Sequence, residues 1–232
     1  MGIKTIVLDA GHGGKDPGCF GHPLVEGKLN LAIAFKLGAF IEKNLPDIKV
    51  IYTRKTDKFL DIYQRAAIAT RVKADLFISI HCNTMLAGAR KDVQGTEVYV
   101  FGTYKTDENE EIAQRFIARE NNSILLENDY PKYYGGFDPA VASTQAILTV
   151  KQSIFKEQSL KLANGIINES KKLLRITRGV HEGSFALLSL TTMPSVLVQT
   201  GYLSNPEENN ELETERGQSR IAKSIFRAIK AY

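Results

Sequence analysis

Residues 4–9 read KTIVLD, and residues 10–18, AGHGGKDPG, follow them directly. The first stretch is a continuous apolar, β-branched run, which is typical of a strand buried on both faces, as in a parallel sheet. The second is rich in glycine and polar residues, which favours a loop. Because strands buried on both faces belong to sheets that carry helices on each side, this stretch points to an α/β fold.

Strand-like and helix-like segments alternate along the rest of the chain. Further strands are expected at residues 48–53, 75–80, 97–101 and 195–199. Helices are expected at residues 26–44, 60–72 and 108–126, in a long stretch at 140–174 broken near 156–159, from Pro206, and near 217–231. The alternation predicts a single domain over residues 1–232 with a three-layer α/β fold, in which helices cover both faces of a twisted, mostly parallel sheet of about six strands.

Composition bounds the class of protein. The 232 residues are 43% hydrophobic and 24% charged, which is ordinary for a globular chain and excludes a disordered or fibrous one. The net charge of +4 comes without a basic stripe or an aromatic platform, so no nucleic-acid partner is expected. No apolar run approaches the roughly 18 residues of a transmembrane helix.

The ends and the cysteines add little. The first residues lead directly into a strand-like run without a secretory signal, so we expect either a cytoplasmic protein or an excised mature domain. Cys19 and Cys82 form neither a disulfide framework nor a CxxC metal motif. They are expected to be small, partly buried residues.

Polar side chains follow several of the expected strands at the point where each strand ends. His12 comes shortly after the first strand, His81 ends the third, Gln199 ends the last, and Glu26 opens the first helix. In open α/β sheets, sites form beyond the carboxyl ends of the strands. Two histidines and one carboxylate are a sufficient ligand set for catalytic zinc, with the fourth position left for water. Iron and manganese also fit such a set, but the absence of a redox motif favours zinc.

Each of these residues also has a purely structural interpretation. His12 is suited to a glycine-rich turn, Glu26 to the first turn of a helix, where the helix dipole favours an acid, and His81 to a satisfied position in the core. The expected convergence of all three at one edge favours the metal site. Of the remaining histidines, His22 lies in a Gly-Pro loop and is expected at the surface, and His181 is a candidate for lining the same cleft.

Five motifs, in this order, resemble the zinc-dependent N-acetylmuramoyl-L-alanine amidases of the type-3 amidase family. They are residues 8–18, Glu26 with residues 30–32, residues 53–57 with 65–69, residues 74–83, and residues 193–206. The resemblance covers nearly the whole chain and implies that His12, Glu26 and His81 bind zinc. It further implies that the chain cleaves the amide between the lactyl group of N-acetylmuramic acid and L-alanine of the stem peptide. Peptidoglycan and muropeptides are then the substrates, and the location is periplasmic or at the cell wall.

The chain departs from this family pattern at one position. Gln199 stands where the family carries a catalytic glutamate, which would take a proton from a zinc-bound water and deliver it to the leaving amine. A glutamine amide can hydrogen-bond that water but cannot accept its proton. We expect activity to fall by about 10²–10⁴-fold while zinc binding survives. Because every other motif is intact, an engineered inactive variant is favoured over a natural member that is weakly active or only binds. Glu182 is the candidate substitute base.

The segment between Phe101 and Gly179 is longer than a compact crossover requires. It resembles the regulatory region of the division-associated amidases, in which a helix occludes the zinc cleft until an activator protein removes it. The resemblance implies a regulatory insertion within about residues 103–158, with an autoinhibitory element within about 130–158. The alternative is a structural insertion that packs on the edge of the sheet.

Three functions of different classes therefore stay open. The leading one is a zinc amidase that remodels the cell wall and separates daughter cells. The second is a zinc-containing module that binds peptidoglycan without cutting it, and the third is another metal hydrolase, such as a carboxypeptidase-like enzyme. Asn83, Arg65 and His181 are the candidate substrate contacts, although Arg54 and Arg65 are equally suited to buried structural ion pairs.

Overall fold

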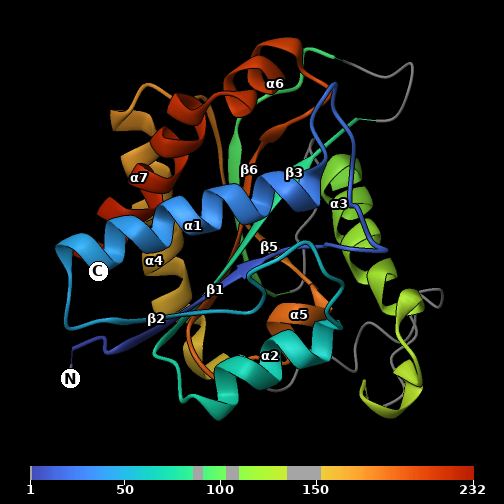
Figure 1. Ribbon diagram of the computed structural model, residues 1–232, viewed down its shortest axis with the longest axis vertical. Helices are drawn as coiled ribbons and strands as arrows, with labels where there is room; N and C mark the ends of the chain where they lie inside the picture. Colours follow the sequence, from blue (N-terminus) through green and yellow to red (C-terminus); the bar gives the residue numbers. More distant parts are fainter. Residues whose placement is uncertain (1, 86–90, 103–109, 135–152) are drawn as a thin grey trace.

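Six strands form one sheet in the computed structural model, which describes residues 2–85, 91–102, 110–134 and 153–232 (Figure 1). In chain order they are β1 (Thr5–Ala10), β2 (Lys49–Tyr52), β3 (Leu76–Asn83), β4 (Thr96–Phe101), β5 (Thr177–Gly183) and β6 (Ser195–Tyr202). Their spatial order is β2-β1-β3-β6-β4-β5. The first four in this order run parallel, whereas β4 is antiparallel to β6 and parallel to β5. The predicted α/β fold around a mostly parallel sheet is confirmed.

Helices cover both faces of this sheet. One face carries α1 (Glu26–Asn44), α4 (Lys156–Lys172) and α7 (Glu215–Ala231), and the other carries α2 (Ile62–Arg71), α3 (Glu110–Asn122) and α5 (Ala186–Ser189). Helix α6 (Pro206–Glu213) packs against α7 and β6, and short 3-10 helices span Ser123–Leu126, Tyr130–Lys132 and Ser153–Phe155. Among the described helices, none combines the length and the apolar character needed to cross a bilayer.

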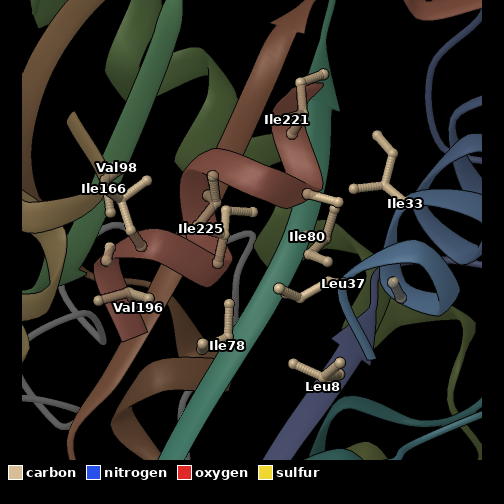
Figure 2. Close-up of a cluster of buried hydrophobic side chains, with 14 of the residues drawn as sticks. Leu8, Ile33, Leu37, Ile78, Ile80, Val98, Ile166, Val196, Ile221 and Ile225 are labelled. Atoms are coloured by element: carbon tan, nitrogen blue, oxygen red, sulfur yellow. The ribbon is translucent and has the colours of Figure 1, made fainter. Parts of the chain in front are cut away.

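The core is divided by the sheet into two apolar clusters. Successive side chains of a strand point to opposite faces, so Ile78 of β3 joins the cluster beneath α1 and α7, whereas Phe77 joins the one beneath α2 and α5. Ile33 and Leu37 of α1 are fully buried against the first cluster (Figure 2). The central strands are apolar on both faces for this reason, and a continuous apolar run in the sequence is their signature.

Strand β5 was not expected from the sequence. Its residues, TRGVHEG, include charged side chains and two glycines, and all but the last are only half-buried. Among the described strands it pairs with β4 alone and lies at the edge of the sheet, so it needs neither two apolar faces nor a clean alternation. The part of the expected 140–174 helix that precedes residue 153 lies outside the described residues. Helix α4 begins at Lys156, where a break in that stretch was expected.

Candidate metal centre

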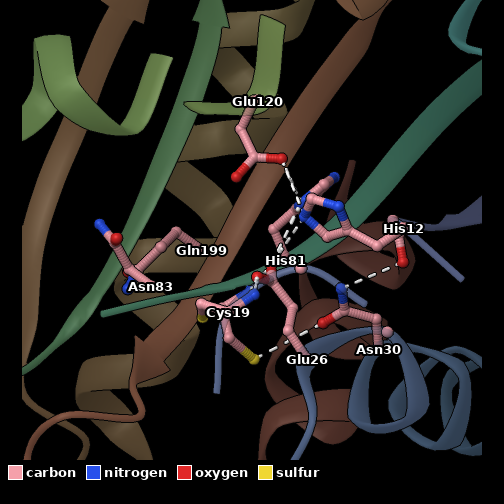
Figure 3. Close-up of polar contacts among 12 residues, drawn as sticks. His12, Cys19, Glu26, Asn30, His81, Asn83, Glu120 and Gln199 are labelled. Atoms are coloured by element: carbon pink, nitrogen blue, oxygen red, sulfur yellow. Dashed lines mark hydrogen bonds and ion pairs between the residues drawn. The ribbon is translucent and has the colours of Figure 1, made fainter. Parts of the chain in front are cut away.

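Four buried side chains from distant parts of the chain meet at the carboxyl edge of the sheet. His12 follows β1, His81 lies near the end of β3, Glu26 is the first residue of α1, and Glu120 comes from α3. Because β1 and β3 are adjacent and parallel, their carboxyl ends bring the two histidines together, with ring centroids 5.0 Å apart. One ligand atom from each of the four residues lies within 4.8 Å of the others, and Figure 3 shows the side chains pointing toward one another.

The two imidazoles leave ring nitrogens without hydrogen bonds in the middle of this cluster. His12 Nε2 and His81 Nδ1 are buried and have no hydrogen-bond partner among the described residues. Each lies 3.3 Å from Glu26 Oε1, and they lie 3.1 and 3.0 Å from Glu120 Oε2. Ligand atoms about 2.0–2.2 Å from a tetrahedral zinc would stand roughly 3.3 Å apart. The donor types, their spacing and the unsatisfied nitrogens therefore fit a bound metal ion. Without such an ion, burying the two ring nitrogens without a partner would be costly.

The chain fixes which nitrogen of His12 faces the cluster. His12 Nδ1 lies 2.8 Å from Asp16 Oδ2, a contact in which the ring nitrogen donates to the carboxylate. The lone pair of the neutral ring is then on Nε2, which faces the cluster. Asp16 also accepts a hydrogen bond from the Ser123 hydroxyl at 2.9 Å, so the same carboxylate contacts the segment that follows α3.

His81 has room only because residue 11 is a glycine. A Cβ atom at Gly11 would stand 2.2 Å from the His81 ring, far inside van der Waals contact. The Gly-rich loop after β1 therefore serves two needs: it turns the chain so that His12 reaches the site, and it leaves space for the second imidazole.

Glu26 is held by backbone groups. Its Oε1 accepts the Cys82 N–H at 2.8 Å and its Oε2 accepts the Cys19 N–H at 2.8 Å. Burial alone would raise the pKa of Glu26, but His12 and Arg119 outweigh it and hold this pKa well below its usual range. Both cysteines are buried and outside any disulfide, and they contribute to the site through the peptide N–H groups that Glu26 accepts.

The electrostatic field at the cluster favours a cation. Burial acts to lower the pKa of His12, but the carboxylates of Glu26 and Glu120 outweigh it and raise this pKa well above the ordinary value. The pKa of His81 is raised in the same way, with burial opposing and Glu120 giving the largest favourable contribution. Two carboxylates that stabilise positive charge on buried rings would also stabilise a metal ion between them.

Glu120 is the residue that the sequence argument missed. It lies on the buried face of α3 with Ala113, Phe116 and Ile117, at the helical spacing of an otherwise apolar stripe. An acid on such a stripe was the available signal. Its neighbour Arg119 donates to the Cys82 carbonyl at 2.9 Å and to Glu120 at 2.6 Å, and its guanidinium lies 3.4 Å from Glu26.

A second buried network supports the loop that carries His12. Asp9 of β1 accepts hydrogen bonds from Arg65 at 2.8 Å, Thr53 at 2.6 Å and Ser79 at 2.7 Å. Burial would raise the pKa of Asp9, but Arg65 and the two hydroxyls outweigh it and leave this pKa below its usual value. Arg65 also donates to the carbonyls of Ala10 at 2.7 Å and His12 at 2.9 Å. Arg65 therefore makes the buried structural ion pair that was one of its two expected roles. Its contact with substrate stays a prediction.

Gln199 lies beside His81 on the neighbouring strand, where the two residues are in register. It is fully buried, and both polar atoms of its amide form hydrogen bonds. Oε1 accepts the Glu97 N–H at 3.3 Å, and Nε2 donates to the Gly201 carbonyl at 2.8 Å. The Gly201 contact needs an N–H donor, which a glutamate carboxylate lacks. The role of position 199 as the catalytic position stays a prediction.

The other two candidate substrate contacts lie on either side of this position. Asn83 ends β3 and, with Arg119, Phe116 and Met85, lines a cavity of about 470 Å³ beside the cluster. His181 is on β5 at the sheet edge, separated from β3 by β4 and β6, and its Nε2 lies 3.0 Å from the Arg178 carbonyl. The contacts of Asn83 and His181 with substrate stay predictions.

The fold and the buried cluster define an α/β protein with a His/Glu group that could hold a metal ion at the carboxyl edge of its sheet. The sequence model of the N-acetylmuramoyl-L-alanine amidase family matches residues 6–231, and the chain belongs to this family of peptidoglycan hydrolases. The assignment agrees with the resemblance found in the motifs, and it covers all four residues of the cluster.

Individual relatives and solved structures extend this similarity. The amidase AmiC of Escherichia coli O6:H1 is 33% identical over 230 residues, which cover 98% of this chain and 52% of AmiC. A putative amidase of Buchnera aphidicola subsp. Acyrthosiphon pisum is 31% identical over 238 residues, covering 98% of this chain and 94% of that protein. The catalytic domain of CwlV from Bacillus (Paenibacillus) polymyxa var. colistinus superposes with a TM-score of 0.65 at 28% identity, covering 99% and 98% of the two chains. The chain thus spans about half the length of AmiC.

The expected regulatory insertion is only partly described. Residues 103–109 and 135–152 lie outside the described residues, and most of the expected autoinhibitory element at 130–158 falls there. Within the insertion, the described part that reaches the metal centre is α3, which precedes that range and carries Glu120.

Proposed function

We propose that this chain is a zinc-dependent N-acetylmuramoyl-L-alanine amidase domain in a resting state, with Glu120 of α3 in the fourth ligand position. Its reaction would be hydrolysis of the amide between the lactyl group of N-acetylmuramic acid and L-alanine of the stem peptide. The observation that carries the proposal is the cluster itself, in which two unsatisfied ring nitrogens and two carboxylates converge within 4.8 Å.

His12, Glu26 and His81 would hold the ion, and each is oriented by the core of the domain. Zinc bound by three protein ligands lowers the pKa of a coordinated water and polarises a carbonyl. Asp16 keeps His12 Nε2 facing the ion, and two peptide N–H groups hold Glu26 in place. Asn83 is the best placed of the candidate substrate contacts, because it lines the cavity and its Oδ1 lies 3.4 Å from Arg119, which contacts both Glu26 and Glu120.

Glu120 would exclude water and substrate while α3 stays in place. Structural zinc sites are closed by four protein ligands, whereas catalytic sites keep one position open. Opening this site therefore requires Glu120 to withdraw. In this proposal an activator protein displaces α3, and the chain acts in cell-wall remodelling and daughter-cell separation outside the cytoplasmic membrane.

Gln199 would leave the opened site without its proton acceptor. The amide at this position accepts one N–H and donates to one carbonyl, and it takes no proton at neutral pH. We expect the chain as written to be impaired by about 10²–10⁴-fold for this reason. Glu182 is a weak substitute, since its carboxylate is paired with Lys156 at 2.8 Å.

The test compares four zinc-loaded proteins: the chain as written, Gln199→Glu, Glu120→Gln, and the double variant. Each is incubated with muropeptides, and mass spectrometry measures stem peptide with a free L-alanine amino terminus. We expect the double variant to cut fastest, Gln199→Glu to cut slowly, and the two proteins with Gln199 to stay near background. Glu111→Gln in the Gln199→Glu background is the matched control, because Glu111 is an exposed acid on the same helix that pairs with Arg115.

Two observations favour a second candidate, a zinc-containing module that binds peptidoglycan without cutting it. The four candidate ligands leave no position for a catalytic water, and the Gln199 amide is hydrogen-bonded through both its oxygen and its nitrogen. Each of these two features disfavours hydrolysis. If none of the four proteins releases stem peptide while all retain zinc and bind purified cell walls, the binding module replaces the amidase.

A further inference from the structure

Helix α3 ends at Asn122, two residues after Glu120, and the chain continues into a segment that crosses to another part of the domain. This segment, residues 123–134, contains the 3-10 helices Ser123–Leu126 and Tyr130–Lys132, and we call it the latch. It leaves the carboxyl end of α3 and contacts the amino-terminal end of α2 (Figure 1). The latch therefore joins an element that bears a metal-site residue to a helix of the core.

Two latch side chains complete the amino-terminal end of α2. The first N–H groups of a helix lack partners within the helix, and Asp61, which precedes α2, makes no side-chain cap. The Ile62 N–H donates instead to Glu127 Oε1 at 2.6 Å, and the Tyr63 N–H donates to the Tyr134 hydroxyl at 3.1 Å. A carboxylate is favourable at this positive end of a helix.

The two latch side chains also hold one another. The Tyr134 hydroxyl donates to the Glu127 carboxylate, with its oxygen 2.8 and 2.6 Å from Oε1 and Oε2. Glu127 is 6% exposed and Tyr134 is 3% exposed, so both polar groups depend on this network rather than on water. Tyr133 adds a ring stacked on Tyr63, with centroids 3.8 Å apart. Removing one member leaves buried polar groups unpaired, which is what makes such networks cooperative.

The latch is connected to the metal centre through a short, continuous path. Glu127 follows Glu120 by seven residues, and Ile124 between them is fully buried in the cluster beneath α2 and α5. The Ser123 hydroxyl donates to Asp16, the carboxylate that orients His12. Moving Glu120 away from the histidines along with α3 would therefore strain or break contacts at both ends of this path.

We propose that the Glu127–Tyr134 contact with α2 is a latch that holds α3, and with it Glu120, at the metal centre. This inference rests on the proposed function only in that α3 is the element that withdraws. Glu127 and Tyr134 are positioning residues: they contribute no atom to the four-residue cluster and line neither the cavity at the cluster nor the one beside it. They set how often α3 opens and hence how readily a partner could displace it.

The test measures hydrogen exchange by mass spectrometry in the zinc-loaded full chain and its Tyr134→Phe variant. Losing hydrogen bonds to a buried charged group increases the population of the opened state by about 10- to 100-fold. We expect the exchange rates of α3 amides and of the first turn of α2 to rise together by that factor, with β3 and β6 unchanged. Tyr130→Phe is the matched control, because Tyr130 is a tyrosine of the same latch that takes no part in the hydrogen bonds between Glu127, Tyr134 and α2.

Two outcomes overturn the latch. In the first, the α2 amides exchange faster in Tyr134→Phe while α3 keeps its protection, which makes Glu127 and Tyr134 a local cap only. In the second, Tyr130→Phe changes α3 exchange as much as Tyr134→Phe does. If Tyr134→Phe does not fold, Glu127→Gln keeps the shape and an acceptor for Ile62, and an increase of about fivefold in α3 exchange is expected. Unchanged α3 exchange in that variant also overturns the proposal.

This readout separates the latch from the proposed function. Exchange is measured without substrate and does not need hydrolysis, so a chain that never cuts muropeptides still reports on the latch. Conversely, hydrolysis by the Gln199→Glu, Glu120→Gln double variant together with unchanged α3 exchange in Tyr134→Phe supports the amidase and overturns the latch.

Discussion

Glu26 and Glu120 face the same pair of histidines, but the chain holds them in different ways. Glu26 begins a long helix of the core, and peptide N–H groups of residues 19 and 82 fix both of its oxygens. Glu120 comes from α3, whose side-chain partner for this carboxylate is the adjacent Arg119. Three residues of the centre are therefore built into the central layers of the domain, while the fourth depends on a helix that one apolar stripe and a few polar contacts hold in place.

The largest effect is expected from Asp9→Asn, which changes the buried network that supports the His12 loop and should lower the free energy of unfolding. The change leaves Arg65 buried without its carboxylate, and breaking a buried pair in this way costs about 3–5 kcal/mol. Urea unfolding measures the loss in free energy of unfolding. Asp57→Asn is a suitable control, since Asp57 is an exposed residue whose contact is with the Gly14 N–H of the same loop. Equal losses in the two variants would contradict the central role of Asp9.

The same residue predicts how stability responds to acid. The pKa of Asp9 is lower in the folded chain than in the unfolded chain, where it is about 3.9. Its contribution is therefore fully present above that unfolded value and is lost as the pH falls toward the folded pKa. We expect the free energy of unfolding to fall less steeply below about pH 4 in Asp9→Asn than in the unchanged chain. Parallel curves for the two proteins would count against this assignment.

The next prediction concerns the loss of zinc affinity when each of the two glutamates is replaced by glutamine. Glu26→Gln is expected to weaken zinc binding by more than about 100-fold, beyond the 10- to 100-fold typical of residues that only orient ligands. Glu120→Gln is expected to weaken it by about tenfold or less, because water can take the fourth position in a three-ligand site. Competition with a chelating dye measures both. Equal losses would mean that Glu120 is as integral to the centre as Glu26.

An effect smaller than that of Glu26→Gln is expected from Asp16→Asn. It weakens the hydrogen bond that orients His12, and zinc affinity should fall by about 10- to 100-fold, toward the lower end because an asparagine oxygen still accepts the ring N–H. The chelator competition that compares the glutamates measures it. Ser123→Ala removes the other side-chain partner of the same carboxylate, and a loss as large as that of Asp16→Asn would place the orientation of His12 under the control of the latch.

Much of this arrangement is readable from local sequence. Apolar runs predicted β1 and β3, a helical stripe from Leu29 to Ile41 predicted α1, and the carboxyl-edge rule for α/β sheets suggested that the residues at their ends meet. The edge strand β5 escaped because it is half-buried and lacks the apolar pattern. Glu120 was not predicted as a site residue because an acid in a helix is ordinary, and only its place on the buried face distinguishes it.

By itself the sequence determined the α/β class, the positions of His12, Glu26 and His81 at element ends, and the presence of an amide in place of a carboxylate at residue 199. These features depend on residue type and on contacts within a few positions along the chain. Only the tertiary structure decided that α3 brings Glu120 to the histidines and that Glu127 and Tyr134 fasten the following segment to α2. Those contacts join residues tens of positions apart, and their free energy exists only once the packed sheet and helices exclude water from them.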